Sequence, residues 1–455
     1  MSPTPTPAPA RTPAWLSTWM AASTALFFLL MLSAPSGYSM SGGLLFLGGI
    51  MIWLATSAVQ RNRAIDAPDS SAAAWSGEDR VLCWLLLAFF LTNAVTVLWH
   101  GDSGKYLDQG IRYVLAIPIL AGLRRARLRL DWLWAGLGLG LMGAAAVAWW
   151  QTSHIGIRRA DGFLTSAIPF GDIALLMAFW CFMGAVLAGQ RRRHAWAVFL
   201  LAGTLAGAYA FIASATRGGL VALPILVILA AAALLQPRRA HPLALRHTMM
   251  VAGGVAVVAA GAAAVMIALP SGQIAEGRYT HAMTEWRAYA QEGDARNNIG
   301  SRLEAWKSAL ISIPERPLLG WGHKEYDAQI QRLIEAERIH PFVATLANTH
   351  NNFIEVWLRQ GSLGLIAFLA LMITSFWYFC RRLRAPSLVV RVLACCGASL
   401  PAGFAAFGLT QVILGRNNGV MFFVLSLAIL WAAMRQMEAD ARRSVTEAQS
   451  DRNRR

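Results

Sequence analysis

The chain has 455 residues, of which 56% are hydrophobic and only 14% are charged, and its mean hydropathy is +0.47. These values exclude an ordinary soluble globular domain. A formal net charge of +16 would suggest a nucleic-acid partner in a soluble protein, but most arginines lie in short loops between apolar runs. That placement is typical of membrane topology signals, so we expect membrane lipids, and no nucleic acid, as partners.

Apolar runs of about 17 to 25 residues recur along the chain, and each can cross a hydrocarbon core roughly 30 Å thick as a helix. The sequence therefore predicts an all-α polytopic integral membrane protein with about twelve transmembrane helices. We expect spans near residues 15–34, 41–59, 81–99, 106–123, 130–150, 167–188, 195–213, 218–235, 248–269, 361–380, 388–411 and 418–436. Many spans follow the first, so we read it as uncleaved rather than as a signal peptide.

The basic loops predict the orientation. If the N-terminus is cytoplasmic, the clusters at 123–129, 190–195, 236–247 and 381–391 and the Arg-rich tail all lie inside, as the positive-inside bias requires. Residues 1–14, rich in Pro and Thr, then form a disordered cytoplasmic tail, and residues 437–455 form a second cytoplasmic tail. An even number of spans returns the C-terminus to the cytoplasm.

One large polar segment, 270–349, separates spans 1–9 (15–269) from the stretch 350–436 with spans 10–12. With this orientation it lies outside. It carries Trp, Tyr and Leu at helical spacing, so we expect several amphipathic helices packed over the membrane face. The Pro-rich turn ISIPERPLLGWG, 311–322, should end one of them. No internal repeat links the two halves, which weighs against common secondary-transporter architectures.

Four arginines and one histidine fall on this outer side. His350 begins HNNFIEVWLRQGSLG, and a histidine with its unperturbed pKa of about 6.5 can do acid or base work near neutral pH. Arg217 lies in the short turn ATRGG, where two glycines leave backbone N–H groups open to an anion. Arg302 opens RLEAWKSAL, and Arg158 and Arg159 lie in IRRADGF. Converging guanidinium groups can hold a diphosphate bidentately.

Each of these candidate site residues also has a simpler structural interpretation. His350 could only cap a helix, Arg158 and Arg159 could anchor lipid head groups, and Arg302 could pair with a carboxylate on an exposed helix face. Glu304, Glu325 and Glu355 read as solvated or paired surface acids, and His323 as a loop residue. The sequence contains no DxD or HExxH motif, and its five cysteines lie in or beside apolar runs. We therefore expect no metal and no cofactor.

The motifs RADGF, ATRGG, RLEAWKSAL…RPLLGWG and HNNFIEVWLRQGSLG, in this order around one large outer segment, resemble the bacterial O-antigen ligase and polymerase superfamily. They cover roughly residues 155–380. The position of the large segment between spans nine and ten is most similar to the O-antigen ligases, and it implies a GT-C-like architecture. One departure is Thr216, where many relatives have a serine beside the arginine.

The resemblance implies a metal-independent, inverting glycosyltransferase of the bacterial inner membrane. It would transfer an O-antigen glycan from undecaprenyl diphosphate to a sugar hydroxyl of the lipid A core on the periplasmic face. His350 would be the catalytic general base, and Arg217, Arg302 and Arg159 would bind the donor diphosphate, with Asn351 and Arg158 in support. An O-antigen polymerase or a protein O-oligosaccharyltransferase remains an alternative, and a transporter of lipid-linked substrates is the alternative from another class.

Overall fold

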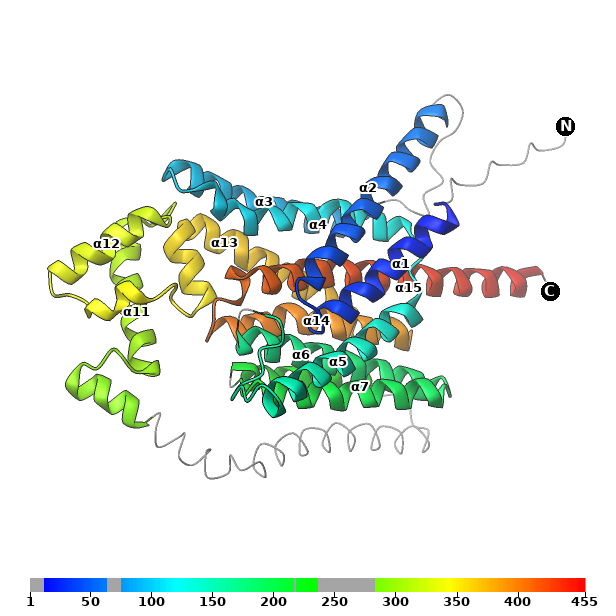
Figure 1. Ribbon diagram of the computed structural model, residues 1–455. Coiled ribbons are helices and arrows are strands. Elements are labelled where there is room, and N and C mark those ends of the chain that lie inside the picture. Colours follow the sequence, from blue (N-terminus) through cyan, green and yellow to red (C-terminus); the bar gives the residue numbers. More distant parts are fainter. Residues whose placement is uncertain (1–11, 64–74, 165, 217, 236–282, 455) are drawn as a thin grey trace.

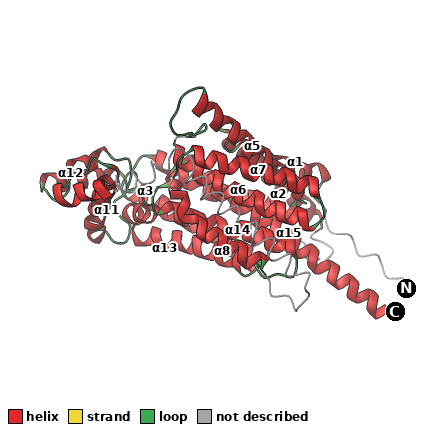
Figure 2. Cartoon of the chain, turned by 90° about the horizontal axis from the view of Figure 1, so that it is seen from below, coloured by secondary structure: helices red, strands yellow, loops and turns green. Residues whose placement is uncertain are grey.

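The computed structural model describes residues 12–63, 75–164, 166–216, 218–235 and 283–454. These residues form helices joined by turns, and no strand occurs among them, so the all-α prediction is confirmed. The long helices run side by side as one bundle (Figures 1 and 2). Their bounds are α1 Ala14–Leu30, α2 Gly37–Arg63, α3 Gly77–Trp99, α4 Leu107–Arg125, α5 Leu130–Ser153, α6 Ala167–Gln190, α7 His194–Ala213, α8 Leu223–Leu234, α13 Asn352–Cys380, α14 Leu388–Gly408 and α15 Asn417–Arg454.

In the described part of the chain, eight helices are long and apolar enough to cross a membrane: α2, α3, α5, α6, α7, α13, α14 and α15. Two shorter apolar helical segments, Ala14–Leu30 and Gly218–Leu234, occupy the positions of the first and eighth expected spans. Helix α4 occupies that of the fourth. The chain is thus a polytopic membrane protein. The ninth expected span, 248–269, lies outside the described residues, so the number twelve stays a prediction.

Helices α6 and α14 and the first half of α15 form the most buried part of the bundle. There the Trp180 indole stacks on Phe422 at 5.4 Å between ring centroids, and its Nε1–H donates to the Ser399 hydroxyl at 2.8 Å. Helices α1 and α5 approach closely because a Cβ on Gly136 or Gly140 would lie only 2.3 or 2.1 Å from a backbone oxygen of α1. Such close contact through small residues is how membrane helices gain packing energy in lipid.

The basic loops meet at one end of the bundle. Arg382, after α13, pairs with Glu78 at the start of α3 and with Glu438 of α15, the latter at 3.3 Å. Arg124 reaches Asp79 at 3.2 Å. The first described residues and the end of α15 lie at this same end, and α11 and α12 lie at the other (Figure 1). This arrangement agrees with the predicted orientation; which end faces the cytoplasm stays a prediction.

The described part of the predicted outer segment, 283–349, contains short helices, as expected: α11 Asn298–Ser312, the 3-10 turn η3 Ile313–Glu315, α12 Lys324–Glu335 and the 3-10 turn η4 Pro341–Thr345. Helix α11 ends where the Pro-rich turn begins, which confirms that prediction. A small separate core holds the segment together and includes Leu358 of α13; its other buried members include Trp321, Tyr326, Ile330, Leu333 and Val343. The segment is therefore packed onto the bundle.

Helix α13 is broken at Gly361, whose φ of +64° and ψ of −166° are non-helical. The loop 317–322 fills the break with backbone hydrogen bonds. The N–H groups of Trp321 and Gly322 donate to the carbonyls of Leu358 and Arg359, at 2.9 and 3.1 Å. In return, the N–H groups of residues 362 and 363 donate to the carbonyls of residues 317 and 318. The exposed backbone groups of a broken helix are thus satisfied by the outer segment.

Candidate functional site

His350 lies just before α13 in the left-handed region, with φ +54°. Its backbone N–H donates to the Asn348 side-chain oxygen at 3.0 Å, and its Nδ1 lies 2.9 Å from the Gln411 Oε1 atom. Because an amide oxygen can only accept, this contact requires a proton on Nδ1. In the neutral imidazole the proton-free nitrogen is then Nε2, which is the form that a general base needs. Gln411 itself is buried in the loop after α14.

Asn351 caps α13. Its side-chain oxygen accepts from the N–H groups of Phe353 and Ile354 at 2.9 and 3.1 Å, and its side-chain N–H₂ donates to the Leu409 carbonyl at 3.4 Å. The helix-capping role that the sequence analysis considered for His350 therefore falls to the next residue. Both residues are held against the loop that follows α14, so the cap fixes where the imidazole sits.

Arg302 is the fifth residue of α11. One turn later on the same helix, the Trp306 indole N–H donates to the Thr349 carbonyl at 2.8 Å, next to His350. Because residues four apart share a helix face, Arg302 and Trp306 present the same side of α11. Arg302 makes interactions of its own. The structure thus brings the face of α11 that carries this arginine to the histidine stretch.

Arg217 lies outside the described residues, but both of its neighbours are placed. Thr216 is buried, and its hydroxyl donates to the Ala167 carbonyl at 3.1 Å. A Cβ on Gly218 would lie 2.5 Å from the hydroxyl oxygen of Thr410, the residue before Gln411. The turn ATRGG is thus beside the loop that holds His350. Thr216 therefore ties the turn to α6.

Arg159 packs against the same turn. Its Nε–H donates to the Ser214 carbonyl at 3.0 Å, and the next backbone N–H, that of Ala160, donates to Ala213 at 2.9 Å. The structure therefore brings Arg159 to the turn ATRGG. Arg158 is exposed.

Glu304, which the sequence indicated as a surface acid, is buried, and Glu355 is partly buried; both are paired. Glu304 is 4% exposed and accepts from the Tyr289 hydroxyl at 2.5 Å and from the His340 N–H at 2.8 Å. Glu355 accepts from the Thr349 N–H at 2.9 Å and pairs with Arg359 at 3.0 Å. The spacing of Glu355 and Arg359 in FIEVWLR, four apart on one helix face, is the sequence signal that could have revealed this pair.

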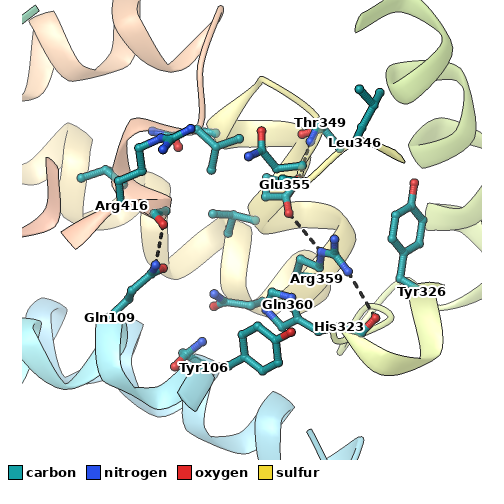
Figure 3. A pocket seen from close by; sticks show the side chains of 18 of the residues that line it. Tyr106, Gln109, His323, Tyr326, Leu346, Thr349, Glu355, Arg359, Gln360 and Arg416 are labelled. Atoms are coloured by element: carbon teal, nitrogen blue, oxygen red, sulfur yellow. Dashed lines mark hydrogen bonds and ion pairs between the residues drawn. The ribbon is translucent and has the colours of Figure 1, made fainter. Parts of the chain in front are cut away.

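A cavity of about 630 Å³ opens beside the histidine stretch. It lies between α3, α4, α12, α13 and the 3-10 turn η5 Ile413–Gly415, and Asn348, Thr349 and Asn352 on either side of His350 line it. Figure 3 shows Arg359 between Glu355 and the His323 carbonyl, with Tyr106 beside His323 and with Gln109 and Arg416 on the other side of the cavity. His323 stacks on Tyr106, 3.6 Å between ring centroids.

Two ionisable side chains at this cavity, His323 and Arg359, differ in their surroundings. Burial lowers the pKa of His323, and the positive charge of the nearby Arg359 guanidinium lowers it further, to about 4. The imidazole is therefore neutral at neutral pH. His323 is thus not the plain loop residue that the sequence suggested. Arg359 is a hydrogen-bond donor to the Gly322 carbonyl, at 3.0 Å, as well as to Glu355. Its charge is therefore already matched within the protein.

Part of the chain is similar to a known protein family. Residues 202–369 match the model of the family described as "O-Antigen ligase". This segment is 168 of the 455 residues of the chain. An uncharacterized protein of Haemophilus influenzae is 22% identical over 398 residues, which is 88% of this chain and 94% of that protein.

This similarity supports a glycosyl-transfer enzyme of the ligase or polymerase type, and the long apolar helices support its insertion in a membrane. The matched region of the O-antigen ligase family includes Arg217, Arg302 and His350, and it ends within α13. Arg158 and Arg159 precede it. Gln411, which contacts His350, follows it, so sequence motifs alone did not point to that residue.

Proposed function

We propose that this protein is an O-antigen ligase, which transfers O-antigen glycan from undecaprenyl diphosphate to a sugar hydroxyl of the lipid A core on the periplasmic face of the inner membrane. The observation that carries the proposal is the His350 imidazole, oriented by Gln411 at the end of the bundle that carries the outer segment. The similarity of residues 202–369 to the O-antigen ligase family supports the same class of reaction.

In the proposed reaction, Nε2 of His350 takes the proton from the acceptor hydroxyl. The hydroxyl oxygen bonds to the anomeric carbon of the glycan, while the bond from that carbon to the diphosphate oxygen breaks. Undecaprenyl diphosphate leaves with the bonding electrons, and attack from the opposite face inverts the anomeric centre. General-base help of this kind typically contributes about 10²–10⁴-fold in rate.

The arginines would stabilise the leaving diphosphate. Arg217 and Arg302 are the principal candidates, since their helix and turn adjoin the histidine stretch, and Arg159 would assist from the loop packed on Ser214. At an effective dielectric near 20, each close Arg–phosphate pair has a Coulomb energy of roughly 4 kcal/mol before desolvation. Two or three such pairs would favour departure of the diphosphate.

The test is glycan transfer in vitro with purified protein, undecaprenyl-diphosphate-linked O-antigen and lipid A core, with and without excess EDTA. We expect the parent protein to transfer glycan in both conditions, and His350→Ala and Arg217→Ala to lose at least about 100-fold in rate while keeping the thermal midpoint. Arg384→Ala, in the loop at the opposite end, serves as the matched control. Parental transfer by a folded His350→Ala variant would overturn the role of the histidine.

A second readout separates ligase from polymerase. In a cell that lacks this protein, loss of all capping of the lipid A core indicates a ligase. Retention of single-unit caps indicates a polymerase. Failure of the purified protein to consume donor at all would reopen the transporter alternative.

A further inference from the structure

The cavity beside His350 holds neutral polar groups that the proposed mechanism does not use. Tyr113 of α4 and Asn352 of α13 line it and are each 2% exposed, and Asn93 of α3 lines it as well. Among the described residues, the Tyr113 hydroxyl, the Asn352 Nδ2 and the Asn93 Oδ1 have no hydrogen-bond partner. Buried polar groups are nearly always paired, so three such atoms around one cavity indicate a ligand that supplies the missing partners.

These three groups match the hydrogen-bonding pattern of a sugar. An amide N–H₂ donates, an amide oxygen accepts and a phenol does both, whereas each sugar hydroxyl both donates and accepts. Phe89 and Phe368, whose rings lie 5.5 Å apart, add apolar surface to the same cavity for the C–H face of a sugar ring. A volume of about 630 Å³ is within the range of small-molecule sites and leaves room for more than one ring.

Two arginines line the cavity, and both already interact within the protein: Arg416 makes an interaction of its own, and Arg359 is paired as follows. Arg359 is matched by Glu355 and by the Gly322 carbonyl. His323 is stacked on Tyr106. A diphosphate would therefore have to displace an existing ion pair in order to bind here, whereas a sugar would not.

Gly110 shapes the cavity next to Asn93. A Cβ on Gly110 would lie 2.5 Å from the Asn93 Oδ1 atom, so the absence of a side chain at this position is what lets the Asn93 amide occupy its place. The cavity and His350 are neighbours, since Asn348, Thr349 and Asn352 line it. A sugar bound here would lie next to the proposed base.

We propose that this cavity binds a sugar ring of a glycolipid substrate, through Asn93, Tyr113 and Asn352. The inference rests on the proposed function, because it names the part of the substrate that this region recognises. The sugar could belong to the glycan of the donor or to the lipid A core, and the two sources share the chemistry that the cavity selects.

The test compares Tyr113→Phe and Asn93→Leu with the parent and with Tyr378→Phe, a matched control near the other end of α13. The KM values for lipid A core and for glycan-linked undecaprenyl diphosphate are measured, together with direct binding of undecaprenyl diphosphate that carries no sugar. We expect each cavity variant to raise one KM about three- to tenfold, the loss of one net hydrogen bond, and to leave sugar-free binding and the thermal midpoint unchanged. The KM that rises identifies the donor glycan or the core.

Unchanged KM values for both glycolipids, with parental kcat, would overturn the proposal and show that the polar atoms hold water only. An equal loss of binding for sugar-free undecaprenyl diphosphate would also overturn it, in favour of a lipid or diphosphate site. If the parent transfers no glycan, the proposed function fails, while direct binding of the two glycolipids to parent and Tyr113→Phe still tests the sugar site. Gly110→Ala, which would crowd Asn93, should then weaken the same binding.

Discussion

At the residue scale, the imidazole of His350 depends on Gln411 for its orientation. The contact of 2.9 Å between Nδ1 and Oε1 fixes which nitrogen is free of a proton. Nothing in the motif HNNFIEVWLRQGSLG reveals this partner, because it lies 61 residues further along the chain. The sequence could single out the histidine as a candidate from its position at the predicted membrane boundary, but not the group that orients it, since that contact exists only once α13 and α14 have packed.

We therefore expect Gln411→Leu to lower kcat about tenfold with little change in either KM, because the imidazole loses its preferred tautomer without losing substrate contacts. Gln411→Glu should retain more activity, but the rise of activity with pH should move to higher pH, since a carboxylate favours the protonated imidazole. The measurement is the pH profile of transfer by purified protein. Identical profiles for parent and Gln411→Glu would remove Gln411 from a positioning role.

At the element scale, the sequence predicted where helix α13 divides into two parts, but it assigned only the second part to a membrane span. The expected span 361–380 begins at the observed break, because hydropathy rises there. Residues 352–360 precede the expected span, but they form a helical segment that carries the Glu355–Arg359 pair. Period and composition are local and could be read from the sequence; the loop that satisfies the break comes from about 40 residues earlier and could not.

Gly361 and Gly320 should tolerate no side chain. Both have positive φ, and a Cβ on Gly361 would lie 2.2 Å from the Leu318 carbonyl oxygen, while one on Gly320 would lie 2.6 Å from the Leu358 carbonyl oxygen. We expect Gly361→Ala to destabilise the protein by more than about 3 kcal/mol, visible as a lower thermal midpoint in detergent. Gly104→Ala, at a position with open space, should leave the midpoint unchanged. A parental midpoint for Gly361→Ala would show that the break can relax.

At the scale of the whole molecule, docking of the outer segment onto the bundle should depend on pH. The His323 ring, just before α12, stacks on the Tyr106 ring, just before α4. The backbone N–H of His323 donates to the Asp102 carboxylate at 2.7 Å. The pKa of His323 is lowered to about 4, whereas a histidine in an unfolded chain titrates near 6.5. The folded state thus binds fewer protons, so stability is fully present above pH 6.5 and falls as pH drops from about 6.5 to about 4.

The free energy of unfolding should fall by about 3 kcal/mol once the pH is below about 4, because each pKa unit corresponds to 1.36 kcal/mol. Hydrogen exchange of residues 324–335 between pH 7.5 and 4.5 should report it as falling protection, after correction for the intrinsic rate. His323→Phe should flatten this dependence, whereas His154→Gln, an exposed histidine of the loop after α5, should leave it as in the parent. The same slope in parent and His323→Phe would assign the effect to another group.

The interlocked backbones of the loop 317–322 and the break at Gly361 also bear on the order in which the chain is assembled. Residues 317–322 are synthesised before Gly361. The backbone groups of α13 with which this loop forms hydrogen bonds have therefore not yet been synthesised when the loop emerges from the ribosome. The outer segment can therefore complete its docking only after the following membrane helix has been threaded. A nascent chain that stops short of this helix would lack the backbone partners of the loop, and the proposed site beside it would be incomplete.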